Sequence, residues 1–185
     1  MNTQRLPAFL DAFTELVTHT SEEQGILAEG ATLLHALVAH DDWLPPSYSQ
    51  SSPDGYRQYL LFADPDSRFV VVSFIWQPGQ FTPVHDHTVW GLVGLLRGIE
   101  RNEPFHRDPG GKLHSRGHSV LQPGDVVAVS PRIGDLHRVA NTGDQDAISI
   151  HVYGGDIGRI ERHSFDPASG RAKSFVSGYS QVPTG

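Results

Sequence analysis

Apolar residues in the first forty positions recur at intervals of three and four. Two such series are Phe9, Leu10, Phe13, Leu16 and Val17, followed by Ile26, Leu27, Leu33, Leu34, Leu37 and Val38. This spacing places the apolar side chains on one face of a helix. Pro7 suits the first turn of the earlier helix, and Thr20 or Ser21 suits the N-cap of the later one. We therefore predict two helices within residues 1–43 that pack on one side of a sheet.

From Tyr56 onward the pattern changes to short β-rich stretches that are separated by turn sequences such as Gln122-Pro123-Gly124-Asp125. We predict strands at 59–62, 69–76, 90–96, 119–121, 126–129, 136–139 and 148–153. Many short strands at this spacing are typical of a sandwich or barrel, and a jelly roll fits best. The fold class is therefore mainly β. Residues 1–185 are predicted to form one domain, with a helical part at 1–43 and a β-barrel at 56–180.

Charge and composition restrict the class of function. The formal net charge is -7 at pH 7 and no basic run offsets it, which disfavours nucleic acid as a partner. No apolar stretch is long enough for a membrane span, and the N-terminus lacks a signal-peptide core. The chain has no cysteine, so disulfides, thiolate ligands and a cysteine nucleophile are excluded. We expect a cytoplasmic protein that binds small molecules; the sequence does not indicate its oligomeric state.

The most informative stretch is Pro83-Val84-His85-Asp86-His87-Thr88-Val89-Trp90-Gly91. Alternate residues of a strand point to the same face, so His85 and His87 can reach one metal ion. His137 is the third candidate ligand. Imidazole suits iron, zinc, copper and nickel, so the ligands do not identify the metal. Zinc-dependent hydrolysis and Fe(II)-dependent oxygen chemistry both stay open on this pattern alone.

A second polar pattern occupies the last predicted strand, where Ser149, His151 and Tyr153 alternate. On a strand these three side chains share one face. They can form a hydrogen-bonded relay that ends in the phenol. The alternative is a polar strand face that is open to water.

The histidines and the glycines around them resemble the two cupin motifs. The matching positions are Gly79, His85, His87 and Gly98 for the first motif, and Gly124, Pro131, Gly134, His137 and Asn141 for the second. The spacing from Gly124 to Pro131 is one residue longer than usual. The resemblance implies a cupin jelly-roll barrel, also called a double-stranded β-helix. The carboxylate ligand that the cupin pattern usually offers falls on Gly91, which leaves three neutral imidazoles.

With Ser149-x-His151-x-Tyr153 added, the chain resembles the cysteine dioxygenase family of thiol dioxygenases from about Tyr56 to Tyr179. Family members add both atoms of O2 to a small thiol and form the sulfinic acid. The resemblance implies that the three histidines bind one Fe(II) per chain. It also implies that the serine, histidine and tyrosine form an outer-sphere catalytic triad.

Two departures refine this resemblance. Mammalian members carry a cysteine near the Gly91 position that is crosslinked to the triad tyrosine; since this chain has no cysteine, Tyr153 must be uncrosslinked. Those enzymes also carry an arginine for the substrate carboxylate where this chain has Gln58. Bacterial members with glutamine there resemble 3-mercaptopropionate dioxygenases, in which a later arginine, aligned with Arg162, receives the carboxylate. Arg159 is close enough in sequence to leave the choice open.

The leading hypothesis is a non-haem Fe(II) thiol dioxygenase that converts 3-mercaptopropionate, or cysteine, and O2 to the sulfinic acid. Arg162 and Gln58 are the expected substrate-binding residues. The competing hypothesis is a non-catalytic cupin that binds a small molecule, or a metal-dependent isomerase. The Ser-His-Tyr pattern favours the first, whereas the physiological thiol and the metal are not indicated by the sequence.

Overall fold

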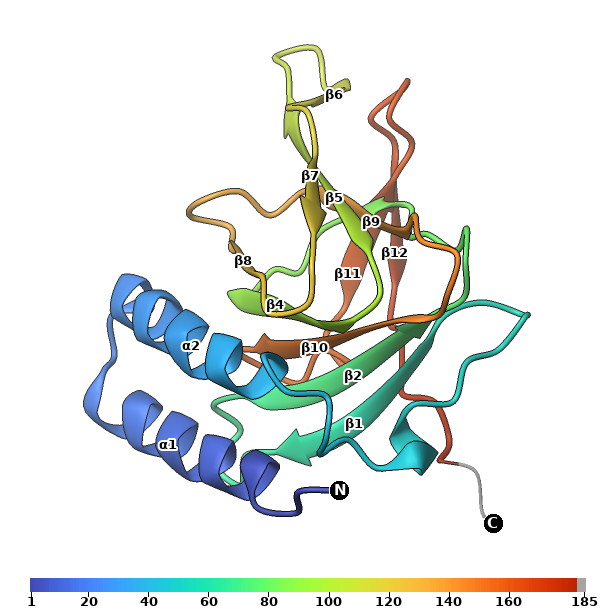
Figure 1. The fold of residues 1–185 in the computed structure, drawn as a ribbon. Coiled ribbons are helices and arrows are strands. Elements are labelled where there is room, and N and C mark those ends of the chain that lie inside the picture. Colours follow the sequence, from blue (N-terminus) through green and yellow to red (C-terminus); the bar gives the residue numbers. More distant parts are fainter. Residues whose placement is uncertain (183–185) are drawn as a thin grey trace.

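The computed structural model describes residues 1–182, whose strands form two antiparallel sheets that curl around a common interior (Figure 1). The five-stranded sheet has the order β1 (Arg57–Ala63), β2 (Val70–Trp76), β10 (Ala147–Tyr153), β4 (Gly91–Arg97) and β8 (Val126–Val129). The seven-stranded sheet has the order β12 (Ala172–Phe175), β11 (Arg162–Phe165), β3 (Val84–His85), β9 (His137–Asn141), β5 (Glu100–Arg107) and β6 (Leu113–Ser115), and β7 (Ser119–Leu121) also pairs with β5. The chain passes repeatedly from one sheet to the other, which is the topology of the cupin jelly roll.

Two helices, α1 (Arg5–His19) and α2 (Glu23–Val38), lie side by side along the five-stranded sheet, as predicted (Figure 1). A short 3₁₀ helix, η1 (Pro46–Tyr48), follows them. The predicted capping of α2 by Thr20 or Ser21 is wrong, because Glu22 occupies the N-cap without a side-chain hydrogen bond. The backbone N–H of Thr20 instead closes the last turn of α1. No helix within residues 1–182 combines the length and apolarity needed to cross a membrane.

Each of the seven predicted strands is present, and β3 (Val84–His85) lies where the His85–His87 spacing implied a strand. Four others were not predicted: β5, β6, β11 and β12. Strand β5 reads Glu-Arg-Asn-Glu-Pro-Phe-His-Arg, so it lacks the apolar alternation that marks a strand with one buried face. This segment is a strand because it pairs with β9 from Glu100 to Pro104, which its composition does not indicate.

Successive side chains of β2 and β10 point alternately into the barrel and toward the face that the helices cover. Val71 and Ile150 pack in the core that also contains α1 and α2, whereas Val72, Phe74 and Tyr153 pack inside the barrel. Because side chains alternate along a strand, burial of Ile148, Ile150 and Val152 against the helices turns Ser149, His151 and Tyr153 toward the barrel interior. The apolar face of β10 therefore positions its polar face.

Candidate metal centre

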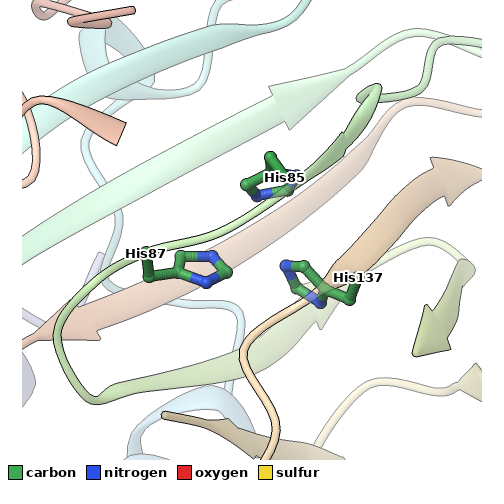
Figure 2. Close-up of side chains that lie close together, drawn as sticks. All are labelled: His85, His87 and His137. Atoms are coloured by element: carbon green, nitrogen blue, oxygen red, sulfur yellow. The ribbon is translucent and has the colours of Figure 1, made fainter. Parts of the chain in front are cut away.

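Three histidine rings converge inside the barrel, as Figure 2 shows. His85 ends β3 and His137 begins β9, and the two residues are directly paired across these strands. His87 approaches from the loop after β3. One ring nitrogen from each histidine lies within 4.8 Å of the other two, and all three side chains are buried. This cluster could hold a single metal ion.

The sequence pattern predicts that His87 reaches the cluster because it alternates with His85 on one strand. The structure shows that this is wrong. Strand β3 ends at His85, and Thr88 has a left-handed backbone with φ of 61°. The carboxylate of Asp135 accepts hydrogen bonds from the backbone N–H groups of His87, at 3.0 Å, and Thr88, at 2.9 Å. A turn held by Asp135 therefore aims the His87 ring, and Asp135 lies two residues before His137 in the second motif.

The three imidazoles are oriented by oxygen atoms that can only accept a hydrogen bond. Each Nδ1–H donates to one of them: His85 to the carbonyl of Pro83 (3.1 Å), His87 to the carboxylate of Asp135 (2.9 Å) and His137 to the amide oxygen of Asn102 (2.8 Å). Such partners keep the proton on Nδ1 and leave the lone pair on Nε2, the arrangement typical of metal-binding histidines. The Nε2 atom of His87 is buried and has no partner within residues 1–182, so it fits a metal ligand.

Burial keeps His85 and His137 uncharged. Burial, with repulsion from His87, lowers the pKa of His85 to about 3. The pKa of His137 also lies well below its ordinary value because of burial and the neighbouring histidines. At neutral pH the rings of His85 and His137 are therefore neutral imidazoles, the form that binds a metal cation.

The triad residues form a continuous chain of hydrogen bonds on β10. Ser149 Oγ lies 2.8 Å from His151 Nε2, and His151 Nδ1 lies 2.7 Å from the Tyr153 hydroxyl. All three side chains are buried, which rules out a polar strand face open to water. Burial holds the pKa of His151 well below its ordinary value and raises that of Tyr153. Since both nitrogens of His151 are engaged, this histidine is not a fourth candidate ligand.

Gly91 makes room for the Tyr153 ring. The two residues are paired across β4 and β10, and a Cβ atom at position 91 would lie 2.7 Å from Cδ1 of Tyr153. The ring also stacks on His87, with centroids 5.5 Å apart. The aromatic ring thus occupies the space of a side chain at the position where the cupin motif usually offers a carboxylate.

A cavity of about 150 Å³ adjoins both groups of residues. His85, His137, His151 and Tyr153 line part of it, whereas Ser149 is not among its lining residues. The rest of the wall is formed by Tyr56, Gln58, Phe74, Trp76, Thr82, Pro83, Val139, Arg162, Ser164 and Phe175. A small molecule in this cavity can therefore meet the histidine cluster and the Tyr153 hydroxyl together.

The structure separates the two candidate arginines. Arg162, the first residue of β11, is buried and lines the cavity. Its Nη2 donates to Ser177 Oγ at 2.9 Å, its guanidinium lies 4.7 Å from the centroid of the Phe175 ring, and its Nε is buried without a partner among the described residues. The side chain of Arg159 is 86% exposed and pairs with Asp156. Arg162 is thus the arginine positioned to meet a ligand in the cavity.

Gln58 also lines the cavity, from β1. Its side-chain nitrogen donates to the carbonyl of Gly178, and its backbone N–H donates to Ser180 Oγ at 3.1 Å. These bonds fix the amide against the C-terminal segment. Gln58 is therefore a neutral wall residue, and one of the two N–H donors of its side-chain amide is already engaged.

Sequence reasoning missed the residues that orient the ligands. Asn102 lies on the unpredicted strand β5 and holds His137. Asp86 accepts hydrogen bonds from the backbone N–H and ring of His163, which ties the segment between the two histidines to β11. For Asp135, the sequence offered one indication, which is its position inside the second motif. For Asn102 and Asp86, the hydrogen bonds to His137 and His163 depend on the fold and could not be read from the sequence.

Comparison with known proteins finds distant structural similarity only. No family model matches the chain. A protein with a double-stranded β-helix domain from Klebsiella pneumoniae is 19% identical, over 63% of this chain and 91% of its own, with a TM-score of 0.46. An oxalate oxidase with bound glycolate is 20% identical over 57% and 53% of the two chains, with a TM-score of 0.45. A cupin superfamily protein from Desulfitobacterium hafniense is 16% identical over 63% and 94%, with a TM-score of 0.45. At this level of similarity these proteins assign no activity to the chain.

Proposed function

We propose that this protein is a non-haem Fe(II) thiol dioxygenase that converts 3-mercaptopropionate and O2 to the sulfinic acid, with cysteine as an alternative substrate. One observation carries the proposal: a single cavity is lined by His85 and His137 of the histidine cluster, by His151 and Tyr153 of the buried Ser-His-Tyr chain, and by a buried arginine. These features match the three needs of a thiol acid, which are a site for sulfur, a hydrogen-bond donor and a cation for the carboxylate.

His85, His87 and His137 would hold the iron. The unpartnered Nε2 of His87 and the acceptor-bound Nδ1 atoms of the three rings fit that role. When bound, iron supplies Lewis acidity toward the thiol and the redox chemistry of O2. Because the three ligands are neutral, the full charge of a divalent ion stays in the cavity and favours an anionic thiolate over a neutral thiol.

Arg162 would anchor the substrate carboxylate. Its guanidinium is buried, and no acidic side chain within residues 1–182 pairs with it. The planar fork of an arginine matches a carboxylate with two parallel charge-assisted hydrogen bonds. The Phe175 ring and Ser177 hold the side chain in place, so little ordering is needed when the substrate binds.

Tyr153 would donate a hydrogen bond to the substrate. Burial raises the pKa of its phenol, so the hydroxyl keeps its proton at neutral pH. His151 and Ser149 fix the direction of that hydroxyl through the bonds of 2.7 and 2.8 Å. The ring stacked on His87 places this donor beside the histidine cluster.

The wall of the cavity favours a thiol acid without an α-amino group. No Asp or Glu is among the lining residues that the structure describes, so the ammonium of cysteine has no countercharge there. Gln58 is neutral and cannot form the charged fork of an arginine. Burial of an unpaired ammonium carries a large desolvation cost. We therefore propose that 3-mercaptopropionate is a better substrate than cysteine.

The test is O2 consumption by the iron-loaded protein with 3-mercaptopropionate, cysteine and cysteamine, together with identification of the products. We expect the highest kcat/KM for 3-mercaptopropionate, a lower value for cysteine and the lowest for cysteamine, which has no carboxylate. A His137→Ala variant prepared in parallel controls for free iron. Absence of thiol-dependent O2 uptake would leave a binding cupin or an isomerase, and a preference for cysteine would overturn the choice of substrate.

A further inference from the structure

A buried carboxyl group lies at the inner end of the triad. Glu100 begins β5 and is completely buried, and neither carboxyl oxygen has a hydrogen-bond partner in the described part of the chain. Its cross-strand neighbours are Asn141 on β9 and Leu121 on β7. From the facing sheet, Ser149 and Trp76 present their donor groups toward the carboxyl group. The side chain of Glu100 therefore adjoins the hydroxyl with which the triad begins.

No positive charge within residues 1–182 offsets the cost of burying an ionised carboxylate here. The amide of Asn141 is already engaged, because it donates to the carbonyls of Trp76 and Gln145. No positively charged residue is among the groups that shift the pKa of Glu100. Burial raises this pKa to about 7, and the donors of Ser149 and Trp76 oppose the rise only in part. A buried carboxyl group without a countercharge is more stable as the neutral acid.

We propose that Glu100 is the fourth member of the Ser149–His151–Tyr153 chain, and that its proton sets the direction in which every group of the chain donates. Loss of this proton would reverse the chain and change Tyr153 from a donor toward the cavity into an acceptor. Glu100 is then a positioning residue that acts through the other three.

In the arrangement that we propose for protonated Glu100, its so far unpartnered O–H turns to Ser149 Oγ and donates to it, and the serine hydroxyl donates to Nε2 of His151 at 2.8 Å. Nδ1–H of His151 then donates to the Tyr153 oxygen at 2.7 Å, so the phenol hydrogen points into the cavity. Trp76 Nε1 donates to Ser149 Oγ at 3.3 Å. The serine oxygen thus accepts two hydrogen bonds and donates one, which satisfies the group completely.

When the chain loses one proton, each remaining proton crosses its own hydrogen bond. The Glu100 proton moves to Ser149, the serine proton moves to Nε2 of His151, and the Nδ1 proton moves to the Tyr153 oxygen. The former phenol proton leaves into the cavity. The chain thus loses one proton in total, and the negative charge stays on the carboxylate of Glu100. Tyr153 then donates to His151 and presents only lone pairs to the cavity.

Glu100 is the member of the chain that titrates near neutral pH. The titratable groups on the facing strand β10 are His151, whose pKa burial lowers far below neutrality, and Tyr153, whose pKa burial raises. Strands β2, β7 and β9 contribute Trp76, Leu121 and Asn141 around the carboxyl group, and none of these side chains titrates. The reversal should therefore follow the ionisation of Glu100.

One consequence rests on the proposed function. If the substrate accepts a hydrogen bond from Tyr153, turnover needs the protonated form of Glu100. The kcat for 3-mercaptopropionate should then fall about tenfold per pH unit above the pKa of Glu100. In Glu100→Gln, the side-chain N–H donates to Ser149 at every pH, so this decline should disappear.

The direct test is the tautomer of His151, measured by two-bond ¹H–¹⁵N NMR on the full-length, ¹⁵N-labelled chain loaded with diamagnetic zinc. The His151 signals are assigned by their absence in His151→Gln. We expect the proton on Nδ1 below about pH 7 and on Nε2 above it. Glu100→Gln should keep the proton on Nδ1 throughout. Glu103→Gln, which makes the same change on β5 at a residue paired with Arg138, should titrate like the parent.

A His151 tautomer that stays the same through the titration of the parent protein would overturn the inference, even if Glu100→Gln does not fold. The same tautomer change in Glu100→Gln as in the parent would also overturn it. The two proposals fail separately. A tautomer change without thiol-dependent O2 uptake would retain the role of Glu100 and reject the dioxygenase, whereas O2 uptake without a tautomer change would do the reverse.

Discussion

Four histidines are buried in the barrel within residues 1–182, and they differ in their hydrogen-bond partners. His85, His87 and His137 lie on or beside strands of the seven-stranded sheet, and each uses Nδ1 to reach an oxygen that can only accept. His151 lies on the five-stranded sheet and is bonded at both nitrogens, to Ser149 and Tyr153. All four rings are buried to a similar degree. Burial alone therefore does not distinguish a candidate ligand from a relay residue; the partners do.

The largest effect should come from removing one ligand. Loss of an orienting partner typically weakens metal binding by about 10- to 100-fold, so loss of a ligand should exceed about 100-fold. We expect His137→Ala to retain almost no metal after dialysis and His151→Ala to retain as much as the parent, both measured by elemental analysis. Equal metal loss in the two variants would erase the distinction between the two groups of histidines.

Ionisation of Glu100, at the inner end of the Ser149–His151–Tyr153 chain, should lower the stability of the folded protein at high pH. The pKa of Glu100 is about 7 in the folded protein against 4.5 for an ordinary glutamate, so the folded state holds the proton more tightly. Its contribution to stability is present below pH 4.5 and is lost as the pH rises to about 7. The loss is on the order of 3 kcal/mol. Urea unfolding should show Glu100→Gln more stable than the parent at pH 8 and nearly equal at acidic pH. No difference at pH 8 would mean that Glu100 is not held as the buried acid.

Substrate anchoring can be separated from the chemistry at sulfur. Arg162→Ala removes a charge-assisted contact, which should cost about 1.5–3 kcal/mol, or roughly one to two decades in kcat/KM for 3-mercaptopropionate. Cysteamine has no carboxylate, so its oxidation should change little. Arg159→Ala, at an exposed position, is the matched control. Similar losses on both substrates would remove Arg162 from the anchoring role.

The smallest expected effect concerns the outer end of the relay. Tyr153→Phe keeps the ring that stacks on His87 and removes one hydrogen bond, so turnover should fall about tenfold while metal content stays unchanged. Steady-state kinetics and elemental analysis on the same sample give both values. Loss of metal in this variant would make Tyr153 a support for His87 instead of a donor to the substrate.

Periodicity in the sequence predicted the elements whose buried faces are apolar. The two helices and strands such as β2 and β10 follow from it, and the glycine and histidine spacing singled out His85, His87 and His137. Strand β5 was missed because its residues at the site, Glu100 and Asn102, are polar where a strand pattern needs apolar residues. The signal for a strand is thus weakest where the strand carries chemistry.

Two features of the site depend on contacts between distant segments. The aim of His87 is set by Asp135, 48 residues away, and not by the strand that the His-x-His spacing suggested. The choice between Arg159 and Arg162 depends on where β11 begins, because Arg162 starts this strand and lines the cavity, whereas Arg159 precedes the strand and does not line it. Residue spacing cannot express either contact, since both arise from the packing of one strand or loop against another.

The central claim is oxygenation of a thiol at the three-histidine cluster, and the most direct measurement uses ¹⁸O2. Iron-loaded protein is given 3-mercaptopropionate under labelled oxygen, and the product is analysed by mass spectrometry. We predict the sulfinic acid with both of its added oxygen atoms carrying the label. A disulfide with hydrogen peroxide, a product without label, or no reaction of the thiol would contradict the claim.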